Sequence, residues 1–211
     1  GLAPFGDDMR HTCLSVSMDY TGGENIIQLK KGIPMTTRYK IRQNLVSIGD
    51  DFWIENEEGQ RVFKVDGKVL RIRKTLVLED MNGKKLAQIQ ERLLTIKDTM
   101  VVEDADGKDI ATIKKALIAP FRDKWDVKVK DGPDLDVQGN ILDHEYSIKA
   151  GREKVAEISK KWFRLTDTYG VEIDPGQNDI LILAVAIAID MMAHDEDGKK
   201  RKKGRDDKKD K

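Results

Sequence analysis

The segment 180–189 constrains the fold more than any other feature, because it holds ten apolar residues in unbroken succession between Asp179 and Asp190. A segment without a polar face must be buried on every side. As a helix, ten residues rise about 15 Å, roughly half the hydrocarbon thickness of a bilayer, which argues against a transmembrane span. We therefore expect this segment to lie inside the core of a folded domain.

Periodicity alone leaves open whether this segment is a helix or a strand, since small alanines alternate with larger residues as they would in a strand. Three observations favour a helix. The apolar stretch continues through 191–193, Asn178 or Asp179 offers an N-cap, and alanines let a helix fit a narrow interior. A helix is the preferred prediction, and a strand is the alternative.

A repeated hairpin pattern precedes the apolar segment. Three copies occupy residues 51–65, 75–89 and 99–113, and their turn glycines lie 24 residues apart. Val, Ile, Leu and Thr on either side of each glycine suit half-buried strands. Asn82-Gly83 and Asp106-Gly107 predict two-residue turns with positive φ at the turn positions. Each copy therefore reads as strand, tight turn, strand.

Further strands are predicted beyond the three copies. Two more hairpins are expected at 124–139 and 145–159, with additional strands within 39–45 and 162–173. Antiparallel strands that follow one another along the chain would leave long unpaired edges in an open sheet. We therefore predict a mainly β fold, a closed antiparallel barrel of about 12 strands around the apolar segment.

Composition divides the chain into three parts. Residues 1–34 show no sustained periodicity and are interpreted as a flexible extension, either foreign to the natural protein or a native mobile arm. Residues 35–193 form the predicted barrel domain. Residues 194–211 are mostly charged and are predicted to be a disordered tail, because such a segment buries too little apolar surface to fold.

Charge and cysteine content exclude several classes of protein. The 38 basic and 38 acidic residues cancel, so the overall charge does not indicate a nucleic-acid partner. A single cysteine, Cys13, excludes an intramolecular disulfide, and no Cys/His spacing indicates zinc. The first residues lack the features of a signal peptide. We expect a cytoplasmic protein without a transmembrane span.

The sequence predicts neither a metal site nor a catalytic site. An EF-hand aligned on Gly83 or Gly107 lacks both its first acid and its final glutamate, so these segments are interpreted as hairpin turns. No nucleophile motif or phosphate-binding glycine loop occurs. His144 beside Glu145 is interpreted as a solvent-facing residue at the start of a strand rather than as an acid–base pair. We expect no enzyme activity and no cofactor.

The best candidate for a ligand site is a cationic stripe within 67–76. A strand there would direct alternate apolar residues to the core and Arg71 and Arg73 to the opposite face. Guanidinium groups suit bidentate contacts with phosphate. We predict an anionic-ligand site formed by Lys68, Arg71, Arg73 and Lys74. The alternative is an ordinary solvated barrel exterior, because the lysine pairs at 84/85, 114/115 and 160/161 are equally basic.

The basic run 199–205 is a second candidate. Each Lys or Arg close to an anionic membrane contributes about 1 kcal/mol of attraction. Acidic residues before and after the run dilute its charge. The alternatives are a nuclear or nucleic-acid patch and, as the preferred interpretation, a solubilising end of the chain.

The chain resembles the LURP-one-related proteins. The resemblance rests on repeated hairpins with a turn of the Asp-x-Asn/Asp-Gly-Lys kind, on the segment 39–68, and on a Tyr-Gly-Val-x-Ile sequence followed by the apolar run and Asp190-Met191-Met192. These proteins belong with the phospholipid scramblases and the tubby C-terminal domain. Over 36–193 the resemblance implies a closed barrel of about twelve strands around a hydrophobic C-terminal helix.

The resemblance implies less about function. Tubby domains bind phosphoinositides and scramblases are credited with calcium-stimulated lipid movement, but LURP-one-related proteins have no settled activity, and a fold alone does not decide. The scramblase calcium segment is matched only loosely by 166–174, so that site is not transferred. We predict a non-enzymatic, tubby-like protein that binds anionic phospholipid headgroups or another anionic ligand at a membrane surface. A scramblase-like lipid-moving protein and a structural or protein-interaction domain are the alternatives.

Overall fold

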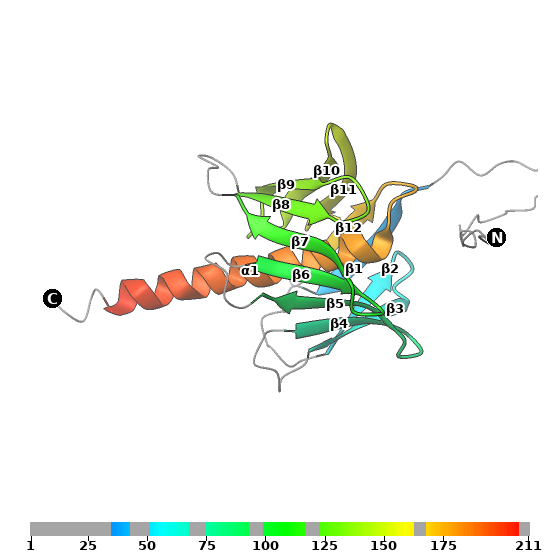
Figure 1. Cartoon of the computed structure of the whole chain (residues 1–211), viewed down its shortest axis with the longest axis horizontal. Helices are drawn as coiled ribbons and strands as arrows, with labels where there is room; N and C mark the ends of the chain where they lie inside the picture. The colour runs from blue at the N-terminus through cyan, green and yellow to red at the C-terminus, as the bar shows by residue number, and fades with distance from the viewer. Residues whose placement is uncertain are drawn as a thin grey trace, which may run out of the picture. The chain divides into compact units, whose positions relative to one another are not determined.

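The computed structural model describes residues 35–42, 51–67, 75–92, 99–116, 123–162 and 168–206, with side chains described as far as Ala193. These residues form twelve β-strands and one α-helix (Figure 1). The elements are β1 (Thr37–Arg42), β2 (Phe52–Asn56), β3 (Arg61–Gly67), β4 (Thr75–Asp80), β5 (Lys85–Glu91), β6 (Thr99–Asp104), β7 (Asp109–Lys115), β8 (Asp123–Val129), β9 (Leu135–Asn140), β10 (Glu145–Ala150), β11 (Glu153–Ser159), β12 (Thr168–Ile173) and α1 (Asp179–Asp206).

The strands form one closed barrel in which each strand pairs antiparallel with its neighbours in the sequence. β1 closes the barrel by pairing with β12, where Tyr39 lies opposite Val171. Closure leaves no free edge among the described strands, which removes the positions at which another chain could pair. The prediction of a mainly β, closed antiparallel barrel of about 12 strands is confirmed.

Alternate side chains of each strand point into the barrel, as the period of two requires. In β9, for example, Leu135 and Val137 are buried, whereas Asp136 and Gln138 are partly or fully exposed. Other strands repeat this pattern, whereas β4, β6 and β12 each bury four consecutive residues. Together the inward side chains give the closed sheet an apolar lumen. That lumen needs an apolar occupant, because apolar surface in contact with water is unfavourable.

α1 supplies that occupant. The side chains of 183–189 have no exposed surface on any face of the helix. The Asn178 side-chain oxygen accepts a hydrogen bond from the Leu181 N–H at 3.0 Å, which satisfies one of the free donors at the helix start. The prediction of a helix is confirmed and the strand alternative is wrong; of the two candidate caps, Asn178 forms the capping bond.

α1 continues after its apolar part. Its backbone is helical as far as Asp206, across residues 194–206, for which the composition predicts disorder (Figure 1). A helix that is already nucleated within the barrel gains one hydrogen bond for each residue it adds, and Lys and Arg are good helix formers. The predicted boundary at 193 is therefore not the end of the helix, while 1–34 and 207–211 lie outside the described residues.

No helix in the described part of the chain combines the length and the apolar character that crossing a membrane requires.

The hairpin turns of the repeat differ from the predicted two-residue type. Between β4 and β5, the Gly83 N–H donates to the Asp80 carbonyl (3.1 Å) and the Asp80 N–H donates to the Lys84 carbonyl (3.0 Å). This pattern encloses three residues, and only the glycine has positive φ, at 79°. It matches a type I turn followed by a left-handed residue. The two-residue prediction is therefore wrong.

Side-chain hydrogen bonds explain the longer turn. The Asp80 carboxylate accepts hydrogen bonds from the backbone N–H groups of Asn82 (2.8 Å) and Lys84 (2.9 Å). These bonds lower the pKa of Asp80 below its ordinary value, and the bond from Lys84 has the larger effect. Asp104 binds its own turn in the same way. The segments that resemble calcium loops are thus hairpin turns, as predicted from their spacing.

We expect Gly83→Ala to lower the free energy of unfolding by about 1–2 kcal/mol, the cost of a left-handed conformation for a residue with a Cβ. A Cβ at Gly83 would meet no atom within 4 Å, so the cost comes from the backbone alone. Gly83→Asn should cost less, because Asn tolerates this conformation. Urea unfolding of the three proteins tests this, and equal stability of the Ala and Asn variants would contradict it.

Candidate functional site

The four residues predicted as an anion site, Lys68, Arg71, Arg73 and Lys74, lie outside the described residues. β3 ends at Gly67, β4 begins at Thr75, and the two strands pair with each other. The segment 68–74 therefore connects two neighbouring strands at one end of the barrel. Its strand conformation and the face on which its arginines lie stay predictions.

The alternating strand directions define two ends of the barrel. At the entry end, where β12 finishes, the Tyr39 hydroxyl donates to the Asp179 carboxylate at 2.7 Å as α1 begins. Burial raises the pKa of Tyr39 well above its ordinary value, and this hydrogen bond raises it further. At the exit end, where the odd-numbered strands finish, Asp190 of α1 meets His144 in the turn after β9. β3, which segment 68–74 follows in the sequence, also finishes at the exit end.

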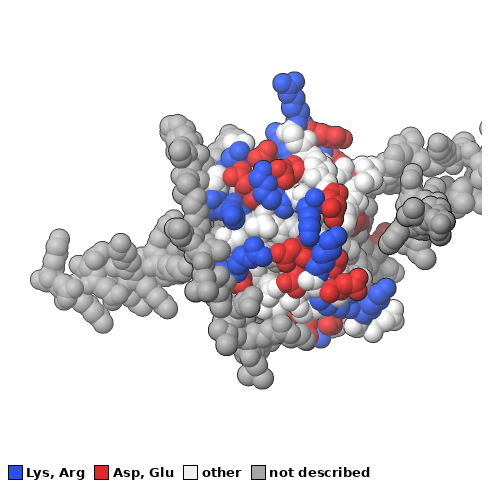
Figure 2. All heavy atoms as spheres, in the orientation of Figure 1, with Lys and Arg blue, Asp and Glu red and all other residues white. Residues whose placement is uncertain are grey.

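The face of the barrel in Figure 2 carries charges of both signs in close alternation. Neighbouring strands pair them, as the distances of 2.7 Å between Lys40 and Glu55 and 3.1 Å between Lys124 and Asp136 show. Ion pairs at a protein surface, such as Lys124–Asp136, contribute little to stability. Because positive and negative side chains alternate, the described strands offer no uniformly positive surface to an anionic ligand. On the described strands, an ordinary solvated exterior accounts for the lysines.

A buried polar cluster links α1 to the barrel near the exit end. His144 Nε2 lies 2.7 Å from Asp190 Oδ1, and the two side chains are only 1% and 2% exposed. The imidazole stacks on the ring of Tyr169, with centroids 4.2 Å apart and an interplanar angle of 24°. A buried carboxylate is costly without a partner, so this contact determines where the end of the apolar segment lies in the barrel.

Tyr146 and Tyr169 complete the cluster. Both hydroxyl groups are buried, and neither forms a hydrogen bond within the part of the chain that the structure describes. Burial raises the pKa of each phenol well above its ordinary value, and the nearby Asp190 carboxylate raises it further. Both tyrosines therefore stay neutral in the physiological range.

A histidine beside a carboxylate can transfer protons, but only to a substrate that reaches it. His144 and Asp190 are enclosed by the barrel, and the ring of Tyr169 covers the imidazole. A hollow lined by Ile110 and Leu181, among others, lies at the opposite end of the barrel and does not include them. The geometry therefore supports a role in positioning α1 rather than in catalysis.

The prediction that His144 faces solvent is wrong. His144 has a φ of 52°, and its side chain points inward to Asp190. Its sequence neighbour Glu145 instead accepts hydrogen bonds from Ser159 at 3.0 Å and Lys161 at 3.1 Å. These bonds outweigh burial, which alone would raise the pKa of Glu145, and they lower it below its ordinary value. One signal in the sequence could have indicated this. Asp190 directly follows the apolar segment, and an acid buried with that segment requires a polar partner.

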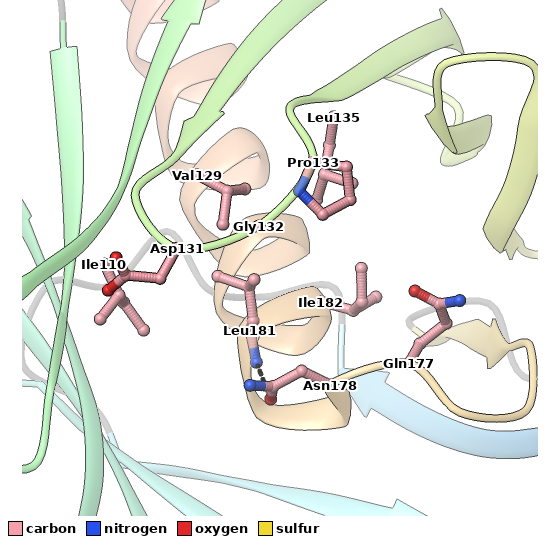
Figure 3. A pocket seen from close by; sticks show the side chains of 10 residues that line it. All are labelled: Ile110, Val129, Asp131, Gly132, Pro133, Leu135, Gln177, Asn178, Leu181 and Ile182. Carbon is pink, nitrogen blue, oxygen red and sulfur yellow. Dashed lines mark hydrogen bonds between the residues drawn. The ribbon is translucent and has the colours of Figure 1, made fainter.

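A hollow of about 330 Å³ lies at the entry end, between the first turn of α1 and the β7–β8–β9 strands (Figure 3). Aliphatic side chains cover most of it, with a few polar groups at the rim. Its lining consists of Ile110, Val129, Asp131, Gly132, Pro133, Leu135, Gln177, Asn178, Leu181 and Ile182. The volume is at the lower limit for small-molecule sites.

Two of the polar groups of this hollow are engaged within the protein. The Asn178 side-chain oxygen caps α1, and Asp131 forms an ion pair with Lys108 at 3.3 Å. Small-molecule sites usually combine an apolar lining with polar groups that converge on the ligand. Without such convergence, the hollow indicates no particular ligand.

Comparison with known proteins identifies the family. The family model for LURP-one-related proteins matches residues 37–190, an interval that includes all twelve strands and the apolar part of α1. The chain belongs to the LURP-one-related family. This confirms the resemblance seen in the sequence. No curated protein matches the chain.

A solved structure shows the same fold as this LURP-one-related barrel. The X-ray structure of a protein from Arabidopsis thaliana superimposes with a TM-score of 0.57, and the alignment covers 76% of this chain and 93% of the other. The two sequences are 21% identical. At that identity the likeness shows the fold alone.

We expect Asp190→Ala to lower the free energy of unfolding by about 3–5 kcal/mol, because it removes the carboxylate from a buried histidine. Asp143→Ala, at an exposed carboxylate of the adjacent turn, is the control and should cost less than about 1.5 kcal/mol. Urea unfolding measures both. A small effect at Asp190 would show that the pair does not hold α1.

A double-variant cycle separates the pair from its surroundings. The variant His144→Phe/Asp190→Leu should be more stable than the sum of the two single effects implies, since an apolar pair avoids the desolvation of an isolated charge. Strict additivity would contradict the role given to this contact.

Proposed function

We propose that this LURP-one-related barrel binds the headgroups of anionic phospholipids, with the exit end of the barrel facing the membrane. The proposal makes it a non-enzymatic, peripheral protein of the cytoplasmic membrane surface. The single observation that carries it is the continuation of α1 as a helix through residues 199–205. Six of these seven residues are basic: Lys199, Lys200, Arg201, Lys202, Lys203 and Arg205.

The charge of this extension favours an anionic surface. Each basic residue close to such a membrane contributes about 1 kcal/mol, and the contributions decay within a Debye length. Three acidic residues at 195–197 reduce the net charge of the extension without reversing it. Because the extension continues a helix that is held in the barrel core, less conformational entropy is lost on binding than for a free tail.

The predicted anion site belongs to the same proposal. Lys68, Arg71, Arg73 and Lys74 lie in the connection that follows β3, and α1 leaves the barrel at that same end. In this proposal the two basic segments, distant in the sequence, act together at one end. Phosphate binding by the related tubby domains supports the proposal by analogy of fold.

Movement of lipid through the bilayer is less well supported. A protein that moves lipids needs a surface that the lipid tails can reach. The side chains of 183–189, the most apolar part of the chain, are fully enclosed by the strands. Binding at the surface requires no such exposure, so we favour it over a scramblase-like activity.

Flotation with liposomes tests the proposal. The protein should float with vesicles that contain phosphatidylserine and not with phosphatidylcholine alone. Binding should weaken as salt rises and the Debye length falls from about 10 Å to about 3 Å. Arg71→Ser/Arg73→Ser and, separately, Lys202→Ser/Lys203→Ser should each reduce binding without a change in the melting curve.

The matched control is Lys84→Ser/Lys85→Ser, which removes two positive charges at the entry end. Equal losses in all three variants would show that only total charge matters and would contradict a membrane-facing exit end. If the parent protein floats with neither kind of vesicle, the proposed function is wrong and a protein-interaction role replaces it.

A further inference from the structure

Two large apolar side chains in the turns of the barrel are about half exposed, and they lie at opposite ends. Leu142, in the turn between β9 and β10 at the exit end, is 46% exposed. Met81, in the turn between β4 and β5 at the entry end, is 48% exposed. Single exposed apolar side chains are common, so exposure alone indicates nothing. The surroundings of Leu142 distinguish it.

We propose that Leu142 is the apolar contact by which the barrel enters the interfacial region of an anionic phospholipid membrane. The inference rests on the proposed function, in which the exit end faces the bilayer. In this arrangement the basic extension of α1 attracts the protein to the anionic membrane, and the β9–β10 turn inserts Leu142 into it. Proteins at membrane surfaces commonly combine these two elements.

The β9–β10 turn holds Leu142 in a fixed position. Ile141 before it is 2% exposed, and His144 after it is 1% exposed and paired with Asp190. The His144 N–H donates to the Ile141 carbonyl at 2.9 Å, which closes the turn. Leu142 therefore projects outward between two buried residues.

Side-chain hydrogen bonds stiffen the turn further. The Asn140 amide donates to the Asp143 carboxylate at 2.5 Å, and the Asp143 N–H donates to the Asn140 side-chain oxygen at 3.2 Å. A turn whose backbone is already held in its bound conformation loses little entropy on insertion. Rigid presentation thus makes a single leucine an effective apolar contact.

The charges around the turn balance, so the turn itself does not repel an anionic surface. Lys160 and Lys161 follow β11, which neighbours β10, and Lys161 is 80% exposed with its ammonium 3.1 Å from Glu145. The two acids of the turn region, Asp143 and Glu145, already accept hydrogen bonds from within the protein. α1 passes the turn at the His144–Asp190 contact before its basic extension begins. Of the two exposed apolar side chains in the described turns, Leu142 is therefore the one at the end of the barrel where the basic extension begins.

Flotation of two matched variants tests the inference. Leu142→Ser should weaken partitioning onto phosphatidylserine vesicles about fivefold, as expected for half of a leucine side chain transferred from water. Met81→Ser removes an equally exposed side chain at the other end and should leave partitioning unchanged. Melting curves should match the parent in both cases, since neither side chain packs in the core.

A fluorescent label locates the contact directly. In a Cys13→Ser background, Leu142→Cys and Met81→Cys are each labelled with an environment-sensitive dye. Emission at position 142 should rise and shift to shorter wavelength with phosphatidylserine vesicles and not with phosphatidylcholine vesicles. Emission at position 81 should not change.

The outcomes separate the inference from the proposed function. If the parent floats with anionic vesicles while Leu142→Ser and Met81→Ser lose equal affinity or none, Leu142 is not the contact and the proposed function stands. A response at position 142 to both vesicle types would reveal non-specific apolar partitioning and overturn the inference. A parent that binds no vesicle overturns both.

Discussion

An α-helix that is apolar on every face is stable in water only when something surrounds it completely, and this requirement shapes the whole molecule. The strands surround α1, and their inward side chains are as apolar as the helix they enclose. The dependence is mutual, because the lumen of a closed barrel must be filled to avoid a cavity. Closing the barrel also removes the strand edges that an open sheet would expose. One packing arrangement thus satisfies both elements.

Apolar contacts alone would not determine how far α1 slides along the barrel. Polar contacts at the two ends do so. At the entry end, Asp179 accepts a hydrogen bond from Tyr39 of β1. At the exit end, Asp190 meets His144, whose ring stacks on Tyr169 of β12. Buried polar pairs often select one arrangement among several apolar ones. The same exit-end contact brings the basic extension and the β9–β10 turn to one end of the barrel.

The sequence predicts the barrel because its signals repeat. Glycines at a fixed spacing and alternating apolar residues specify hairpins, and the apolar segment can be buried only inside the sheet that they form. Contacts between residues distant in sequence could not be predicted in this way. Nothing local indicates that His144 turns inward to Asp190, 46 residues later. Asp80 likewise lengthens its turn through hydrogen bonds that a pattern of Asn-Gly does not reveal. The anion site rests on arginine spacing in a segment outside the described residues.

Native-state hydrogen exchange tests the central claim most directly, which is that α1 and the barrel are one cooperative unit. If they are, the amides of 183–189 exchange only through global unfolding, with the same free energy as the slowest amides of β6 and β11. Their free energies should also fall together with added urea, because the same surface is exposed in both cases. Faster exchange in α1, with a smaller dependence on urea than in the strands, would show that the helix leaves an intact barrel and would contradict this account.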